Sequence, residues 1–261
     1  MRLPKKSLGQ NFLVDNNILN KISNLEVIKN KNILEIGPGT GNLTSFIIGK
    51  KPASIILIEK DYFLFNDLKK KFKNNNTVIF NEDILKSDLE KIIKPKSIII
   101  GNLPYNISSQ ILVKFVKFKT WPPNFDKLIF MFQKEVADRI LAKYNSKNYG
   151  RLSIISNYRL RITDKINISS NSFFPKPKVE STILVFKPIH NPKIKIKNID
   201  NLEKITQSFF SFKRKMIGKV YKEIFSSNKK ILDEQKLNLS QRPSELNLDI
   251  YYKLTKYYEE N

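Results

Sequence analysis

Short apolar runs alternate with longer amphipathic segments over most of the first 190 residues. The runs are bounded by Gly, Pro or Asn, a pattern typical of buried strands. They cover residues 32–36, 55–58, 77–80, 97–100, 128–132, 152–158 and 182–186. Residues 61–72, 108–118 and 134–144 instead have the periodicity of amphipathic helices. This alternation predicts an α/β fold around a mostly parallel sheet.

The last two runs differ from the others because no clear helix separates them. Parallel neighbours in a sheet need a long crossover, whereas antiparallel neighbours do not. Residues 152–158 and 182–186 are therefore expected to form an antiparallel pair at one edge of the sheet.

The pattern changes after residue 187, where Pro188 and Pro192 interrupt it. Apolar side chains then recur at helical spacing, namely Leu202, Ile205, Phe209 and Phe212. The sequence Pro243-Ser244-Glu245 is typical of a capped helix start. We expect an α/β domain over residues 1–190 and a small all-helical domain over residues 198–261.

Composition excludes several kinds of chemistry. The chain has 261 residues, 41% of them hydrophobic, no cysteine and a single histidine, His190. Disulfides, thiolate zinc sites, cysteine nucleophiles and a Ser-His-Asp triad are therefore not expected, and neither is a metal site. The chemistry must use carboxylates, amides, backbone groups, aromatic rings or a cofactor.

A formal net charge of +23 favours a polyanionic partner, because neutralised phosphates release condensed counterions. Most of the basic residues are lysines in a chain also rich in Asn and Ile, so part of the excess reflects overall composition. The cluster Lys213-Arg214-Lys215 is the best candidate for phosphate contacts. No run approaches the roughly 18 apolar residues of a membrane helix, and the N-terminus does not resemble a signal peptide. We expect a soluble, cytoplasmic protein.

A glycine-rich turn follows the first predicted strand, with the sequence EIGPGTG at residues 35–41. Glycines in such a turn allow positive φ and a close approach of backbone to ligand, at the sheet edge where α/β folds bind ligands. The spacing is G-x-G-x-G rather than the dinucleotide G-x-G-x-x-G. Glu59 ends the next strand, where an acid can bind ribose hydroxyls. The pattern favours a nucleoside cofactor, the alternative being a tight turn with a surface acid.

The third strand is followed by Asp83 and Ile84. The carboxylate can accept a hydrogen bond from an adenine amino group, and Ile84 can pack on the ring. Alone, Asp83 would be an ordinary polar residue after a strand. Together with Gly37 and Glu59 it completes a consistent nucleoside site.

The fourth strand leads into Gly101-Asn102-Leu103-Pro104-Tyr105. The exocyclic amino group of adenine is a poor nucleophile, so a site that alkylates it needs acceptors for its protons and a surface for the base. The Asn102 side chain and the Leu103 backbone carbonyl are candidate acceptors. Pro104 stiffens the loop, and Tyr105 can stack on an extruded base. The alternative is a plain turn after a strand.

Seven sequence blocks, in order, resemble the small-subunit ribosomal RNA adenine N6,N6-dimethyltransferase family. They are KSLGQNFL at residues 6–13, EIGPGTG at 35–41, GNLPYNIS at 101–108, QKEVADR at 133–139, YGRLS at 149–153, FFPKPKVES at 173–181 and FFSFKRKM at 209–216. The resemblance runs nearly end to end. It implies a Rossmann-like class I methyltransferase sheet with an antiparallel edge strand, a C-terminal helical domain and S-adenosyl-L-methionine as cofactor.

The resemblance also implies residue roles. Asn11 and Leu13 would contact the cofactor, together with Gly37, Glu59, Asp83, Ile84 and Asn102. Phe173 would stack on the face of the target base opposite Tyr105. Its alternative is a core aromatic before a proline-containing segment.

The implied substrate is a pair of adjacent adenosines in a hairpin loop near the 3′ end of small-subunit rRNA, each receiving two methyl groups, within a small ribosomal subunit precursor. Unpaired loop bases suit recognition by shape and stacking. A monomer is the simpler expectation.

Three alternatives remain. A large-subunit methyltransferase of the macrolide-resistance type is disfavoured by the blocks at residues 133–139 and 149–153. A DNA adenine methyltransferase would need a larger target-recognition region. A non-catalytic assembly factor is disfavoured by the intact Asn102 and Tyr105.

Overall fold

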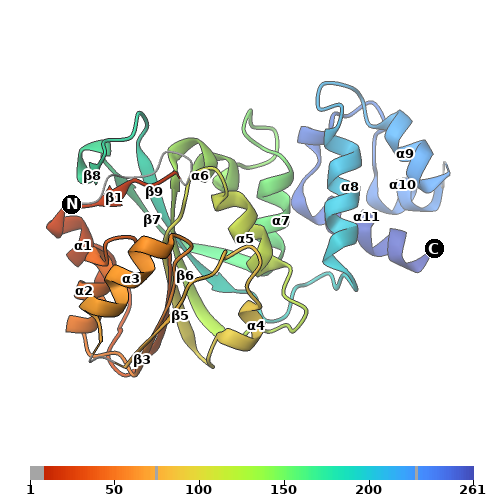
Figure 1. The fold of residues 1–261 in the computed structure, drawn as a ribbon. Coiled ribbons are helices and arrows are strands. Elements are labelled where there is room, and N and C mark those ends of the chain that lie inside the picture. The colour runs from red at the N-terminus through yellow and green to blue at the C-terminus, as the bar shows by residue number, and fades with distance from the viewer. Residues whose placement is uncertain (1–8, 74–75, 227–228) are drawn as a thin grey trace. The chain divides into compact units, whose positions relative to one another are not determined.

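The structure, a computed structural model, describes residues 9–73, 76–226 and 229–261 (Figure 1). The chain folds into two compact units. One comprises the chain up to Lys114 with residues 120–137 and 161–188, and the other comprises residues 115–119, 138–160 and 189–261. None of the described helices has both the length and the apolar character that spanning a bilayer requires.

A seven-stranded sheet forms the centre of the first unit, in the order β4-β3-β2-β5-β6-β9-β7. The strands are β2 (Asn32–Ile36), β3 (Ser54–Ile58), β4 (Thr77–Phe80), β5 (Ser97–Asn102), β6 (Phe125–Gln133), β7 (Leu160–Ile168) and β9 (Ser181–Pro188). Strands β2 to β6 pair in parallel, and β9 runs antiparallel to β6. The predicted α/β class and mostly parallel sheet are confirmed.

Helices cover both faces of this sheet, as its nearly continuous apolar strands require. Helices α1 (Asn16–Ser23), α2 (Asn42–Gly49) and α3 (Tyr62–Lys71) lie on one side in Figure 1, and α4 (Leu89–Ile92) and α5 (Ser108–Val116) lie on the other. Alternate strand residues form one core with α1 to α3, among them Ile33, Leu57 and Ile100. Asp15 and Asp61 cap the N-termini of α1 and α3, and their carboxylates accept backbone N–H groups of the first turn.

The predicted strand at residues 152–158 is wrong, because these residues lie in helix α7 (Arg151–Arg159). The side chains of Ile154, Ile155 and Tyr158 are buried together with Ser153 and Ser156. A helix buried over most of its surface gives an apolar run without clear periodicity, so it resembles a buried strand.

The strand beside β9 at the edge of the sheet is β7 instead. Its apolar residues Leu160, Ile162, Ile166 and Ile168 alternate with polar ones, a period-2 signal that its charged residues obscure. A second, two-stranded sheet was not predicted. In it β1 (Phe12–Leu13) pairs antiparallel with β8 (Phe173–Phe174), which places Leu13 opposite Phe173.

The second unit contains α7 and the C-terminal helices α8 (Ile199–Phe210), α9 (Gly218–Phe225), α10 (Lys229–Gln235) and α11 (Leu248–Glu260). Leu202, Ile205 and Phe209 are buried as their spacing predicts, but Phe212 lies beyond α8 and is 66% exposed. The last helix does not begin at Ser244. Residues 243–245 form a short 3₁₀ turn, and Asn247 caps α11 by accepting the backbone N–H of Ile250. Helix α6 (Lys134–Leu141) completes the described elements between β6 and α7.

Gly41 and Gly49, at the two ends of α2, provide a matched test of the packing. A Cβ at Gly41 would lie 2.7 Å from the Phe72 ring at a φ of +75°, whereas one at Gly49 would meet nothing within 4 Å. Gly41→Ala is expected to lower the free energy of unfolding by about 2 kcal/mol through strain and overpacking. Gly49→Ala should leave it unchanged or slightly higher. Urea unfolding measures both, and equal effects would contradict the packing around α3.

Candidate active site

One cavity opens at the carboxyl edge of the parallel strands, as α/β topology predicts. It is lined by the segment before α1 and by the loops that follow β2, β3, β4 and β5. Ten of the predicted site residues line it: Asn11, Leu13, Gly37, Glu59, Asp83, Ile84, Asn102, Leu103, Pro104 and Tyr105. The predicted cofactor residues and the predicted base-binding loop therefore share one cavity.

The glycine loop after β2 uses the conformational freedom that its sequence predicts. Gly37, Gly39 and Gly41 all have φ between 59° and 75°. The Gly37 N–H donates to the carbonyl of Ile58 at 2.9 Å, which ties the loop to the end of β3. A Cβ at Gly39 would lie 2.9 Å from the Phe12 ring, so the loop also packs closely against the N-terminal segment.

Glu59 connects two loops from inside the cavity wall. Its carboxylate accepts the N–H of Gly39 at 3.1 Å and that of Asp61 at 2.8 Å. The side chain is buried. Burial raises the pKa of Glu59, and the backbone hydrogen bonds act in the opposite direction. The acid after β3 is thus a fixed acceptor at the cavity rather than a mobile surface group.

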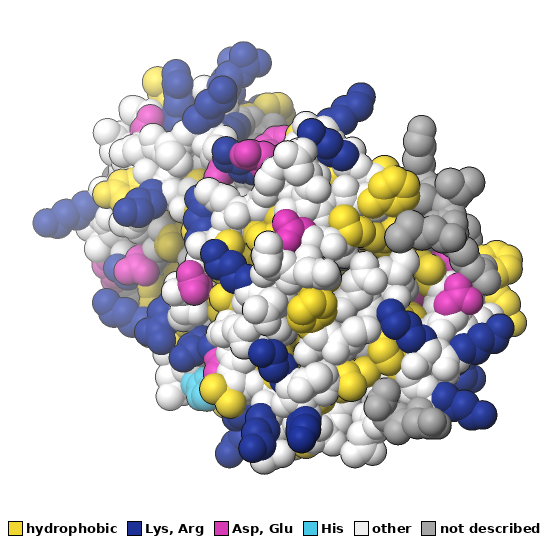
Figure 2. Space-filling model, turned by 90° about the vertical axis from the view of Figure 1, so that its left-hand side faces the viewer, with side chains coloured by type: hydrophobic (Ala, Val, Ile, Leu, Met, Phe, Trp, Pro, Cys, Tyr) yellow, Lys and Arg dark blue, Asp and Glu magenta, His cyan; other side chains and the backbone are white. Residues whose placement is uncertain are grey.

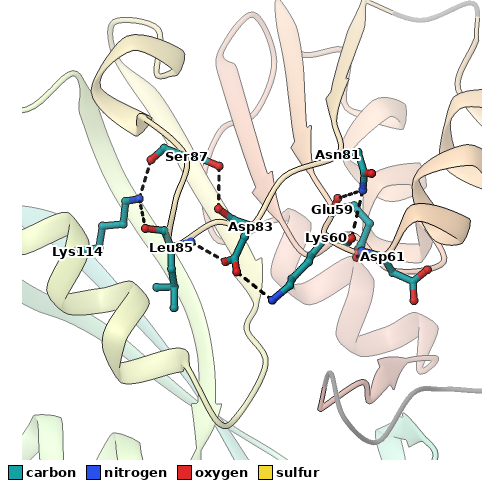
Figure 3. Close-up of polar contacts among 8 residues, drawn as sticks. All are labelled: Glu59, Lys60, Asp61, Asn81, Asp83, Leu85, Ser87 and Lys114. Carbon is teal, nitrogen blue, oxygen red and sulfur yellow. Dashed lines mark hydrogen bonds and ion pairs between the residues drawn. The ribbon is translucent and has the colours of Figure 1, made fainter.

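Asp83 is held in place by its own turn and by a lysine (Figure 3). Its carboxylate accepts the Leu85 N–H at 3.0 Å and the Lys60 ammonium at 2.9 Å. Partial burial acts to raise the pKa of Asp83, but these hydrogen bonds outweigh it and lower the pKa. Asp83 is therefore an ionised acceptor at neutral pH. The next residue, Ile84, is buried and lines the cavity.

Asn102 ends β5 and makes a hydrogen bond to the N-terminal segment. Its Nδ2 donates to the backbone carbonyl of Asn11 at 2.9 Å. This bond fixes the carboxamide with its nitrogen as the donor, so Oδ1 takes the acceptor role. Asn11 was predicted only from the family resemblance, and its contact here is through its backbone. The first three residues of the N-terminal block, Lys6, Ser7 and Leu8, lie outside the described residues.

Tyr105 is oriented by a residue that the sequence reasoning missed. Its hydroxyl lies 2.7 Å from Oγ of Ser181, a buried residue at the start of β9. Burial raises the pKa of Tyr105, opposed by this hydrogen bond, so the phenol is neutral at physiological pH. Ser181 closes the FFPKPKVES block, and its place in that block was the available signal.

Phe173 lies elsewhere in the first unit. It is 4% exposed, belongs to the hydrophobic core and pairs with Leu13 across the β1–β8 sheet. It is not among the described residues that line the cavity, and its neighbour Phe174 is 49% exposed. Its stacking role remains a prediction.

Two further charged side chains lie next to the glycine loop. Glu35 is buried on β2 at the cavity, and the Thr44 hydroxyl donates to it at 2.7 Å. Burial raises the pKa of Glu35 to about 7, against the lowering effect of Thr44. The Lys71 ammonium donates to the carbonyl of Thr40 at 3.1 Å. Within the described residues, no group of three or more His, Cys, Asp or Glu is placed to hold a metal ion.

The sheet order, the glycine loop with an acid after the next strand, and the Asn102–Tyr105 loop at the same cavity define a class I methyltransferase. The sequence pattern of the family described as ribosomal RNA adenine dimethylase matches residues 1–260. The chain therefore belongs to the ribosomal RNA adenine dimethylase family.

Individual relatives agree with this family. The chain is 46% identical over 259 residues to ribosomal RNA small subunit methyltransferase A of Pelagibacter ubique, covering 98% of this chain and 97% of the relative. It is 40% identical to the protein of that name from Mycoplasma mobile, covering 95% of each. A dimethyladenosine transferase from Plasmodium falciparum superposes with a TM-score of 0.77 at 28% identity, covering 95% of this chain and 98% of that one. The chain shares its fold with the 23S rRNA methyltransferase ErmE. That structure superposes with a TM-score of 0.68 at 20% identity, covering 95% of this chain and 99% of that one.

Glu35 predicts a specific pH dependence of stability. Its folded pKa of about 7 lies above its usual value of 4.5. The folded protein therefore keeps a proton that the unfolded chain releases, and this stability is lost as pH rises through 7. Glu35→Gln, neutral at every pH, should match the wild type at pH 4.5 and exceed it at pH 8 by at most about 3 kcal/mol. Chemical unfolding of both proteins at the two pH values tests this prediction. An equal change in the free energy of unfolding at the two pH values would contradict it.

The Tyr105–Ser181 hydrogen bond predicts non-additive effects on methyl transfer. Ser181→Ala and Tyr105→Phe each remove one partner of the bond. Each should lower kcat about fivefold, the effect of about 1 kcal/mol. Because both act through one bond, the double variant should be little slower than either single variant. Multiplying effects in the double variant would show that Ser181 does not act through Tyr105.

Proposed function

We propose that this chain transfers methyl groups from S-adenosylmethionine to N6 of two adjacent adenosines in a hairpin loop near the 3′ end of small-subunit rRNA. The product is N6,N6-dimethyladenosine, made on a small ribosomal subunit precursor in the cytoplasm. The observation that carries the proposal is the single cavity that Gly37, Glu59, Asp83 and the Asn102–Tyr105 loop all line.

The nucleoside part of the cofactor fits the residues at the carboxyl edge. The fixed carboxylate of Glu59 would accept the ribose hydroxyls, and the ionised Asp83 would accept the adenine amino group. Ile84 offers an apolar surface to the ring, while Asn11, Leu13 and Gly37 would enclose the remainder. A largely apolar wall with a few fixed polar groups is typical of small-ligand sites.

The Asn102–Tyr105 loop would orient the target adenine. The cofactor, when bound, supplies an electrophilic methyl group on a sulfonium. Oδ1 of Asn102 and the backbone carbonyl of Leu103 would accept the two N–H groups of N6, which directs its lone pair at the methyl carbon. Pro104 has no N–H to compete for these acceptors. Because the acceptors are already held in place, catalysis comes mainly from positioning and charge placement.

Stacking would hold the base itself. Tyr105, tied to Ser181, would cover one face of the extruded adenine. Phe173 is proposed for the other face, which requires the β1–β8 sheet to yield, because Phe173 is packed in the core in this structure. Phe173→Leu is therefore expected to lower the rate of methyl transfer by more than its effect on the free energy of unfolding explains.

The target in the small subunit is favoured over the alternatives by the close relatives. Both relatives named above carry a small-subunit name at 40% identity or more, whereas the likeness to the large-subunit enzyme is at 20% identity and extends to the fold alone. A DNA substrate lacks any supporting observation.

RNA contacts are proposed for Arg214 and Lys215. Figure 2 shows Lys and Arg spread over the face that it displays, with hydrophobic and uncharged side chains between them, so net charge alone does not mark a binding surface there. In the second unit, the Lys213 ammonium already donates to the carbonyls of Lys147 and Tyr149, at 2.8 and 2.9 Å. The Lys213 ammonium is therefore already engaged within the protein. Its neighbours Arg214 and Lys215 remain as the candidates for phosphate contacts.

The direct test uses labelled S-adenosylmethionine with undermethylated small subunits, large subunits, naked rRNA and duplex DNA. We expect N6,N6-dimethyladenosine with small subunits alone, and Asn102→Ala should abolish it. Label in large subunits would move the chain to the resistance-type function. Tight binding to small subunits without any label would favour a non-catalytic assembly factor.

The phosphate assignment predicts one effect on the salt dependence of binding for Lys213 and another for its neighbours Arg214 and Lys215. Replacing Arg214 and Lys215 by Ala should reduce the slope of log K against log salt by about 2, one for each lost phosphate contact. Lys213→Ala should instead lower stability and leave the slope nearly unchanged. Subunit binding measured between 50 and 200 mM salt, the range in which such contacts act, decides the matter. A slope unaffected by the double replacement would remove both residues from the interface.

A further inference from the structure

The backbone of the loop after β4 accepts hydrogen bonds from one lysine side chain of a neighbouring helix. Lys114 on α5 donates to three backbone carbonyls, those of Ile84 at 2.9 Å, Leu85 at 2.8 Å and Ser87 at 2.6 Å. Figure 3 shows the carbonyls of Leu85 and Ser87 facing the Lys114 ammonium, on the side of the loop away from Lys60 and Glu59. A lysine ammonium has three N–H donors, so this contact uses all of them.

The same loop is organised internally by Asp83. Its backbone carbonyl accepts the N–H groups of Lys86 at 2.8 Å and Ser87 at 3.0 Å, and its carboxylate accepts that of Leu85. The result is a tight turn whose remaining carbonyls point to one place. Several carbonyl dipoles directed at one point repel each other unless a cation lies between them.

The Lys114 side chain is partly shielded from solvent. Lys114 is half-buried, and burial lowers its pKa, against the raising effects of Asp83, Asp88 and Glu82. A partly desolvated ammonium makes stronger hydrogen bonds than a fully exposed one, and its removal leaves three partly buried carbonyls without this donor. Its long side chain is therefore ordered together with the turn.

We propose that Lys114 is a positioning residue that fixes the Asp83–Ile84 turn in the conformation that recognises the cofactor's adenine. The inference rests on the proposed use of S-adenosylmethionine. Lys114 does not line the cavity, so it acts through Asp83 and Ile84. Helix α5 also begins shortly after Tyr105. The helix that carries Lys114 therefore connects the Asp83–Ile84 turn with the Asn102–Tyr105 loop.

The test compares Lys114→Met and Lys114→Arg with a matched control, Lys91→Met. Lys91 lies in α4, directly after the turn, and pairs with Asp88 with its side chain 84% exposed. Its replacement changes the net charge equally and leaves the turn's carbonyls untouched. Two ligands serve as probes, S-adenosylhomocysteine and S-inosylhomocysteine, which lacks the amino group proposed to bind Asp83.

In the ligand-free protein, we expect Lys114→Met to accelerate amide hydrogen exchange over residues 84–88. Its Kd for S-adenosylhomocysteine should rise about tenfold, as expected for the loss of charge-assisted hydrogen bonds. The Kd for S-inosylhomocysteine should change less, so the preference for adenine falls. Lys114→Arg should restore most of this preference, and Lys91→Met should behave as the wild type.

Equal weakening of both ligands, or wild-type exchange and binding in Lys114→Met, would overturn the inference. A general loss of stability would weaken both ligands alike, and thermal unfolding of each variant identifies it. If the wild type binds neither ligand, the proposed function fails first. The exchange rates of the ligand-free turn still decide whether Lys114 orders it.

Discussion

The buried carboxylate of Glu59 is the interaction on which the site depends. It accepts one N–H from the glycine loop after β2 and another at the start of α3, so one acid sets the spacing of two neighbouring loops. Parallel strands bring such loops to the same edge but do not fix their conformations. A desolvated acceptor supplies that precision because moving either loop would leave a buried carboxyl oxygen without its hydrogen bond.

The other walls of the cavity use the same principle with different groups. Lys71 donates to the glycine loop, Lys114 to the turn after β4, and Asn102 to the N-terminal segment. In each case a side chain from one element binds the backbone of another. The site is thus assembled from short loops that are each tied to a rigid helix or strand, which suits chemistry that depends on positioning.

Local sequence patterns were sufficient for strands β2 to β6 and β9 and for the polar residues that follow β3, β4 and β5, but not for β1, β7 or β8. Residues 32–36 and 77–80 form strands with the predicted bounds, and Glu59, Asp83 and Asn102 lie at the predicted edge. The helix at residues 151–159 was missed because burial around it removes the periodicity. The β1–β8 pairing and the partners of Tyr105 and Lys114 join residues far apart in the chain, which no local pattern records.

The central claim is that one cavity brings a nucleoside cofactor to Asn102. A crystal structure with S-adenosylhomocysteine tests it most directly. We predict that the ribose hydroxyls donate to Glu59, that the adenine amino group donates to Asp83, and that the sulfur faces Asn102. The hydrogen bond from Asn102 to the Asn11 carbonyl should stay intact. A ligand bound outside this cavity, or with its adenine in the Asn102–Tyr105 loop, would contradict the account.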